Sequence, residues 1–204
     1  MIKNIVFDLG GVVIDYSPKK TMSRYFSGEA LEFIMKSVFF TRQWNDIDRG
    51  VTTPAEAFAP LEKELGAADY SRLIDIIENW GDYMPPFEET YELVKLLKKS
   101  GLGLYVLSNI PPYFHKIKEE IPALKLFDGF VISSDLKLLK PEPEIFEALL
   151  NKYDLKAEEC YFIDDMQQNI DGAARCGIDG FCFNERSIPA LLADLRAKGV
   201  SLSE

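Results

Sequence analysis

Residues 5–12 read IVFDLGGV, and this stretch decides the fold. Residues 2–7 form a short apolar run rich in β-branched side chains, which predicts a buried β-strand. Asp8 follows directly at the carboxyl end of that strand. Leu9, Gly10 and Gly11 come next, and glycine lets the backbone turn sharply and approach a ligand closely. The stretch therefore predicts a strand that carries one carboxylate into a tight loop.

Similar apolar runs recur in the second half of the chain, with helical patterns between them. We expect strands at 103–108, 130–133, 160–163 and 180–183, and helices at 87–99, 113–120, 143–153 and 168–176. Strands that alternate with helices form a parallel sheet with right-handed crossovers and helices on both faces. In such sheets, ligands bind at the carboxyl ends of the strands near a topological switch point. The expected fold class is α/β with a doubly wound parallel sheet.

Residues 17–80 have a different pattern. Their apolar residues recur at helical spacing in the runs 30–40, 53–65 and 71–80, and no strand pattern interrupts them. The prolines at 85–86 then break the chain. We therefore expect a core formed by residues 1–15 and 84–204, and a small all-helical cap formed by residues 16–83.

Composition excludes several classes of function. The 204 residues include 33 acidic and 23 basic side chains, for a net charge of −10, and no Lys/Arg cluster predicts a nucleic-acid partner. No apolar stretch approaches the roughly 20 residues of a membrane span, and no signal peptide is recognisable. Three cysteines without paired spacing are typical of reduced thiols, so we expect a cytoplasmic protein. With His115 as the only histidine, a catalytic triad or a histidine zinc site is not expected.

Polar side chains stand at the ends of four predicted elements. They are Asp8 after the first strand, Ser108 and Asn109 after the second, Lys140 between the third strand and a helix, and Asp164 and Asp165 after the fourth. In a parallel sheet these residues converge on one edge. Carboxylates that face each other there repel unless a cation lies between them. Oxygen ligands with almost no histidine favour Mg²⁺.

Four motifs, in this order, resemble the haloacid dehalogenase-like hydrolase superfamily over essentially the whole chain. They are IVFDLGGV (5–12), VLSN (106–109), LLKPEPEIF (138–146) and FIDDMQQNIDGA (162–173). The cap stretch WNDIDRGVTTPAEAF (44–58) is similar to members that include bacterial α-glucose-1-phosphate phosphatase and the phosphatase domain of soluble epoxide hydrolase. The resemblance implies a Rossmann-like core and a Mg²⁺-dependent phosphatase acting on a small phosphorylated molecule.

The resemblance also implies a role for each strand-end residue. Asp8 attacks phosphorus and becomes an aspartyl phosphate, while Lys140 neutralises charge on the phosphoryl group. Ser108 and Asn109, the latter through its side chain or its backbone N–H, hold a phosphoryl oxygen. Asp165 binds Mg²⁺ together with the Asp8 carboxylate and the backbone carbonyl of Gly10. Asp164 is a further metal ligand through water, or a partner of Lys140, and Asn169 can share a helix-start face with Asp165. Lys137 competes with Lys140 by spacing but lacks the Lys-Pro context.

The first motif departs from the Asp-x-Asp of many phosphatases in this superfamily, because Gly10 stands where the second Asp protonates the leaving oxygen. General acid–base catalysis is typically worth ~10²–10⁴-fold. We favour a phosphatase whose leaving group needs little protonation, such as an anomeric sugar phosphate, or whose proton comes from another group or from water. A 2-haloacid dehalogenase and a catalytically weak binding or regulatory protein remain alternatives. The Asp164–Asp165 pair counts against the dehalogenase, which needs no metal.

The cap offers four candidate specificity residues, Arg42, Trp44, Asp48 and Arg49. Trp44 could stack on a sugar face, and an arginine could hold a second anionic group. For each of them we favour a structural interpretation. Trp44 then packs inside the cap, and residues 48–50 form a turn with a surface ion pair. The sequence sets neither the substrate nor the oligomeric state.

Overall fold

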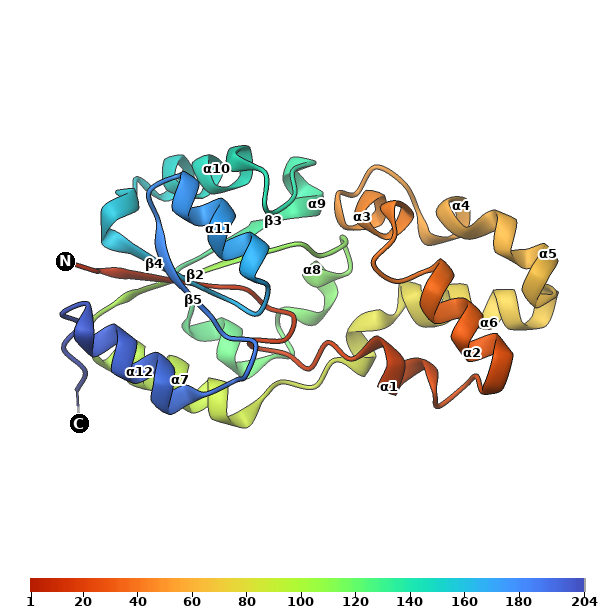
Figure 1. The fold of residues 1–204 in the computed structure, drawn as a ribbon, viewed down its shortest axis with the longest axis horizontal. Coiled ribbons are helices and arrows are strands. Elements are labelled where there is room, and N and C mark those ends of the chain that lie inside the picture. The colour runs from red at the N-terminus through yellow and green to blue at the C-terminus, as the bar shows by residue number, and fades with distance from the viewer. Residues whose placement is uncertain (204) are drawn as a thin grey trace.

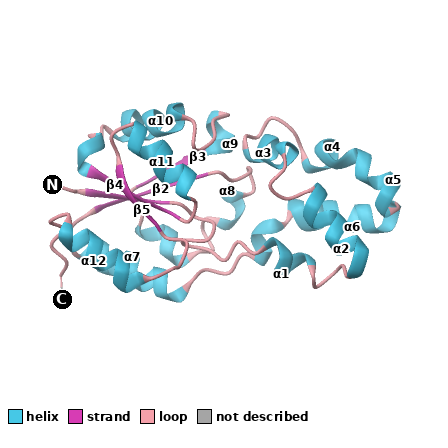
Figure 2. Cartoon of the chain, in the orientation of Figure 1, coloured by secondary structure: helices cyan, strands magenta, loops and turns pink. Residues whose placement is uncertain are grey.

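A five-stranded parallel sheet forms the core of the computed structural model, which describes residues 1–203 (Figures 1 and 2). The strands are β1 (Asn4–Phe7), β2 (Gly103–Ser108), β3 (Gly129–Ile132), β4 (Cys160–Asp164) and β5 (Asp179–Cys182). Each lies within two residues of its predicted place. The order is β3-β2-β1-β4-β5, with β1 in the centre. The chain moves outward from β1 in both directions, which confirms the predicted α/β class and places a topological switch point beside β1.

Alternating side chains of β1 pack into two separate layers. Ile5 and Phe7 join a large apolar cluster on one face of the sheet, whereas Val6 joins a second cluster on the other. All three are fully buried. A strand covered on both faces has no polar side, which explains its continuous apolar sequence.

Helices cover both faces of the sheet (Figure 1). Contacts place α10 (Pro143–Tyr153) and α11 (Gln167–Arg175) over one face, and α7 (Glu88–Lys99) and α12 (Ile188–Ala197) over the other. Shorter elements join them, namely α8 (Phe114–Ile117), η3 (Pro122–Leu126), α9 (Ser133–Leu136) and η4 (Ala157–Glu159). No helix among residues 1–203 is long and apolar enough to cross a bilayer.

The helix predicted at 113–120 is shorter than expected, since α8 covers only Phe114–Ile117. Pro122 disfavours helical backbone at Ile121, and it begins the separate helical turn η3. The chain therefore leaves the α-helix before reaching the proline.

Every regular element between Pro18 and Tyr83 is helical, and together these elements form the helical cap at one end of the molecule (Figure 2). They are α1 (Pro18–Met22), α2 (Gly28–Ser37), α3 (Arg42–Asp48), α4 (Pro54–Phe58), η1 (Ala59–Leu61), α5 (Glu62–Leu65), α6 (Ala67–Glu78) and η2 (Trp80–Tyr83). The single run predicted at 53–65 is divided into three short elements. Pro60 lacks an N–H for a continuous helix, which explains the division.

Candidate active site

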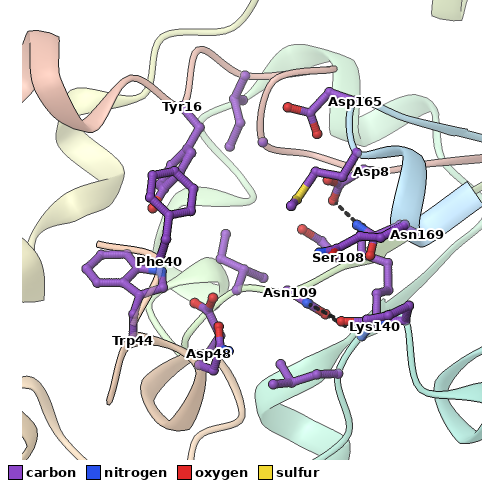
Figure 3. A pocket seen from close by; sticks show the side chains of 18 of the residues that line it. Asp8, Tyr16, Phe40, Trp44, Asp48, Ser108, Asn109, Lys140, Asp165 and Asn169 are labelled. Carbon is purple, nitrogen blue, oxygen red and sulfur yellow. Dashed lines mark hydrogen bonds and ion pairs between the residues drawn. The ribbon is translucent and has the colours of Figure 1, made fainter. Parts of the chain in front are cut away.

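The predicted polar residues meet at the carboxyl edge of the sheet, in a cavity of about 520 Å³ between the core and the helical cap (Figure 3). Asp8 follows β1, Ser108 ends β2 and Asp165 follows β4. Lys140 reaches the same cavity from the loop before α10. Adjacent parallel strands end at one edge, so residues more than 150 positions apart become neighbours.

The loop after β1 turns back on itself directly beside Asp165. The Leu9 carbonyl accepts hydrogen bonds from the backbone N–H groups of residues 12, 13 and 14, and Gly11 N–H donates to Ile14 O at 2.9 Å. Gly11 has φ +72°, and a Cβ there would collide with the Asp165 carboxylate. Glycine is therefore required at position 11 both for the backbone conformation and for the close approach of Asp165.

Lys140 is the centre of the site. Its buried ammonium lies 2.8 Å from Asp8 Oδ1 and 2.7 Å from Asp164 Oδ2. Asp8 Oδ1 also accepts a hydrogen bond from Leu9 N–H at 2.7 Å, whereas Asp8 Oδ2 has no hydrogen-bond partner in residues 1–203. One carboxylate oxygen of Asp8 is thus held in place, and the other is available to a ligand of the cavity.

Asp164 uses both of its oxygens inside the protein. Oδ1 accepts from Met166 N–H at 2.8 Å, both oxygens accept from Asn169 Nδ2 at 3.0 Å, and Oδ2 accepts from Lys140. This arrangement makes Asp164 the partner of Lys140, one of the two roles anticipated for it. It also places Asn169 with Asp164, whereas the sequence placed it beside Asp165.

Ser108, which ends β2, and Asn109, which follows it, have different surroundings. The Asn109 side chain binds the Lys140 backbone twice, accepting from its N–H at 2.8 Å and donating to its carbonyl at 3.0 Å. Its amide therefore fixes the Lys140 loop, and its backbone N–H is left as the group that can meet a phosphoryl oxygen. The buried Ser108 hydroxyl has no hydrogen-bond partner within residues 1–203 and lines the cavity.

Burial and mutual repulsion change the acid–base properties of these groups. Burial raises the pKa of Asp8 to about 7, Lys140 opposes the shift, and the charges of Asp164 and Asp165 add to it. Burial and the Asp164 charge also raise the pKa of Asp165. Burial lowers the pKa of Lys140, but the two adjacent carboxylates outweigh it, so the pKa lies above its ordinary value. Asp8, Asp165 and Lys140 therefore each bind a proton more tightly than the same group does in water.

The donor set fits a divalent cation. Asp8, Asp164 and Asp165 each offer an oxygen within 4.8 Å of the others. Three carboxylates against one ammonium leave two negative charges uncompensated when all are ionised. Asn169 Oδ1, also at the cavity, is a buried oxygen without a hydrogen-bond partner among the described residues. A cluster of hard oxygen donors with excess negative charge matches the preference of Mg²⁺.

Comparison with known proteins assigns the chain to a family. Residues 2–177 match the haloacid dehalogenase-like hydrolases. The chain belongs to this family. A sesquiterpene phosphatase of Aspergillus oryzae is 29% identical over 179 residues, 87% of this chain and 88% of that one. A D-ribitol-5-phosphate phosphatase of Bacteroides thetaiotaomicron is 28% identical over 195 residues, 89% of this chain and 91% of that one.

A family member from Bacteroides thetaiotaomicron has also been solved, as a variant in complex with magnesium and inorganic phosphate. It superimposes with a TM-score of 0.67 at 25% identity, over 89% of this chain and 94% of that chain. The superfamily and the fold predicted from the four motifs are thus confirmed.

In the present chain, the absence of a side chain at Gly10 leaves a space that the Tyr16 ring fills. A Cβ at position 10 would lie 3.3 Å from Tyr16 Cβ and 3.6 Å from Tyr16 Cγ. Tyr16 itself lines the cavity. The position of the second Asp in many family phosphatases is therefore adjacent to an aromatic wall.

Two expectations for the cap need correction. Asp48 is not part of a surface turn, because it ends α3, is buried and lines the cavity. Arg49 does form an ion pair, but with Glu142 of the core. Trp44 packs against Phe39 and Trp80 inside the cap and also lines the cavity. The fourth candidate, Arg42, is exposed beside Asp46.

Sequence reasoning missed Arg186, which braces the loop after β1. Its guanidinium donates to Gly11 O at 2.5 Å, stacks 3.3 Å from the centre of the Phe87 ring, and pairs with Glu89 at 2.9 Å. Arg186 lies in the turn after β5, where no motif marks it. Its charge nevertheless acts on the site, because it lowers the pKa of Asp165 against the larger effects that raise it.

Proposed function

We propose that the chain is a Mg²⁺-dependent phosphatase that hydrolyses a small phosphate monoester through an aspartyl phosphate on Asp8. The proposal depends mainly on the geometry of the Asp8 carboxylate. Lys140 and Leu9 N–H hold its Oδ1, and its Oδ2 is available to the cavity. The phosphatases among its family relatives support the reaction class. The position of Asp8 at the end of β1, beside the Lys140 ammonium, supports the mechanism.

The residues divide the work of the first step. Asp8 Oδ2 attacks phosphorus, and the bond to the ester oxygen breaks. The Ser108 hydroxyl and the Asn109 backbone N–H hold phosphoryl oxygens, since neither group has another partner within residues 1–203. Lys140 neutralises charge that gathers near Asp8, and Asp164 keeps its ammonium in position. Hydrogen-bond donors held in advance are worth more in a buried site than in water.

Asp8, Asp165 and the backbone carbonyl of Gly10 are the proposed direct ligands of Mg²⁺, with Asp164 as an outer ligand through water. When bound, Mg²⁺ supplies positive charge that draws the phosphate to the nucleophile and stabilises the transition state. The three-carboxylate cluster supports this assignment. Magnesium in the structure of the related Bacteroides enzyme supports it independently.

The helical cap is proposed as the unit that selects the substrate, with boundaries at 16–83 and a core of 1–15 and 84–204. Two backbone hydrogen bonds link the segments where the chain leaves and re-enters the core, Asp15 N–H to Pro85 O at 2.8 Å and Phe87 N–H to Val13 O at 2.9 Å. Within the proposed class we favour a sugar phosphate. The Trp44 and Tyr16 rings line the cavity and offer apolar faces that can cover the apolar side of a sugar.

The test is a panel of sugar phosphates, other phosphate monoesters and 2-haloacids, each measured with and without Mg²⁺. We expect phosphate release that stops on chelation and returns when Mg²⁺ is restored. Asp8→Asn should fold normally and release no phosphate, because the amide is not a nucleophile. Metal-independent halide release would identify a dehalogenase instead, and phosphatase activity retained by Asp8→Asn would refute the proposed mechanism.

A further inference from the structure

Gly10 raises the question of which group protonates the leaving oxygen. No side chain is present at position 10, and Tyr16 fills the adjacent space. Lys140 is bound on both sides by carboxylates and is held in its charged form, so it is a poor proton donor. Asp165 belongs to the proposed metal site. The proton donor must therefore be sought elsewhere around the cavity.

Asp48 is a carboxyl group that enters the cavity from the cap. It is the last residue of α3, is only 8% exposed and belongs to the cavity wall. Figure 3 shows its carboxylate pointing into the cavity on the side opposite Asp8 and Asp165. An ester oxygen that leaves in line with the attack departs on the side away from Asp8. Asp48 thus lies on the wall toward which the leaving group moves.

The core holds the backbone at Asp48 firmly. Ser133 Oγ donates to the Asp48 carbonyl at 2.6 Å, and Ile110 N–H donates to the same Ser133 Oγ at 2.9 Å. Arg49, the next residue, donates to Lys137 O at 2.9 Å and pairs with Glu142. These contacts come from the core. They therefore fix the position of Asp48 relative to the catalytic residues, although Asp48 belongs to the cap sequence.

From this geometry we propose that Asp48 is the general acid and general base of the reaction, in the role that the residue at position 10 cannot perform. The inference rests on the proposed phosphatase function and adds a catalytic residue to it.

The proposed steps balance in atoms and charge. In the first step Asp8 Oδ2 bonds to phosphorus, the bond to the ester oxygen breaks, and the Asp48 carboxyl gives its proton to that oxygen. The products are an alcohol, an aspartyl phosphate and an Asp48 carboxylate. In the second step the Asp48 carboxylate takes a proton from a water molecule while the oxygen of that water attacks phosphorus. The bond between phosphorus and Asp8 then breaks, which releases phosphate and restores the Asp8 carboxylate and the protonated Asp48 carboxyl.

The surroundings of Asp48 favour its protonated form before the first step. Burial raises the pKa of Asp48 well above its ordinary value, the Asp8 charge raises it further, and Lys140 and a hydrogen bond from Trp44 lower it in part. Tyr16 and Tyr113 are the other titratable groups that it influences; both are half-buried, and desolvation raises their pKa values well above the ordinary value, so they stay neutral. A carboxyl that holds its proton near neutral pH is suited to donate it.

The decisive experiment compares two esters that differ in their need for an acid. The leaving group of p-nitrophenyl phosphate departs as a stable phenolate, whereas that of benzyl phosphate needs a proton. In Asp48→Asn we expect kcat/KM for benzyl phosphate to fall by ~10²–10⁴-fold and that for p-nitrophenyl phosphate to change little. The variant is matched in shape to the protonated carboxyl, so thermal unfolding should show an intact fold.

The second step gives a separate signature. Rapid mixing of Asp48→Asn with p-nitrophenyl phosphate should give a burst of about one p-nitrophenolate per enzyme, then slow turnover, because no base activates water. Acid quenching during the slow phase should trap phosphate on the protein. Asp46→Asn is the matched control. It removes a carboxylate from the same helix that pairs with the exposed Arg42, and it should behave like the unmodified protein.

The unmodified protein provides a test that does not depend on any variant. Its kcat/KM for benzyl phosphate should fall at high pH as Asp48 loses its proton, and p-nitrophenyl phosphate should lack that decline. Equal losses for both esters in Asp48→Asn without a burst, or no loss for either, would overturn the role of Asp48. Asp8→Asn separates the two claims, because activity in that variant would instead refute the proposed function.

Discussion

Arg49 and Glu142 join the helical cap to the core through a two-pronged ion pair. Arg49 Nη1 lies 3.0 Å from Glu142 Oε2, and Nη2 contacts Oε1. Glu142 Oε2 also accepts Leu139 N–H at 3.0 Å. The pair thus connects the residue after Asp48 to the loop that carries Lys140. A change at this pair should affect catalysis through the position of the cap.

Glu142→Gln is expected to weaken catalysis modestly. Both side chains are partly exposed, so the pair contributes about 0.5–1 kcal/mol, which corresponds to a two- to fivefold fall in kcat/KM. A double-mutant cycle with Arg49→Ala should show coupling between the two residues. Glu159→Gln, which breaks the exposed Lys3–Glu159 pair, is the control and should leave kcat/KM unchanged. If the losses in kcat/KM of the Arg49 and Glu142 variants were additive, the two residues would not be coupled and the prediction would be wrong.

Lys140→Met should abolish turnover and destabilise the protein. The change leaves Asp8 and Asp164 buried together without their counter-charge, which typically costs about 3–5 kcal/mol. Urea unfolding should show a smaller loss at pH 5 than at pH 8, because protonation relieves the repulsion. Lys137→Met tests the competing lysine, whose ammonium contacts the Gly50 carbonyl and no catalytic residue within the described part of the chain. It should keep most of its activity, and a dead Lys137 variant would reverse the assignment.

Binding of Mg²⁺ should depend on pH between 6 and 8. Burial raises the pKa of Asp8 to about 7 in the metal-free protein. Below pH 7 the carboxyl therefore holds a proton that the ion must displace, and affinity should fall by up to about tenfold per pH unit. Above pH 7 the dependence should level off. Calorimetry in buffers of different ionisation enthalpy measures the proton released, and a pH-independent affinity without proton release would contradict this expectation.

Arg186→Leu should weaken Mg²⁺ binding and turnover together. It removes the donor to Gly11 O and the stack on Phe87, so the loop after Asp8 loses its brace. Glu89→Gln is the matched comparison, because it removes only the exposed ion pair and leaves the contacts to the loop. We expect a clearly larger change in the dissociation constant of Mg²⁺ for the arginine variant. Equal effects would show that the ion pair, and not the loop contact, matters.

The amino-acid sequence by itself determined the strands, their alternation with helices and the edge where the site lies. Short apolar runs such as 2–7 and 160–163 favour strands covered on both faces, and parallel strands bring the residues that follow them to one edge. The convergence of Asp8, Lys140 and Asp165 could therefore be predicted without coordinates, and the motifs added the family.

Only the tertiary structure decided which of these groups touch and which cap residue joins them. Asp164 binds Lys140 and Asn169 because of the distances between three separate segments, which no local pattern encodes. Asp48 looked like a turn residue because its neighbours in the sequence are polar, yet the core on the other side of the cavity buries it. Burial depends on what packs against a residue from elsewhere in the chain, and this is the physical reason that local sequence could not reveal it.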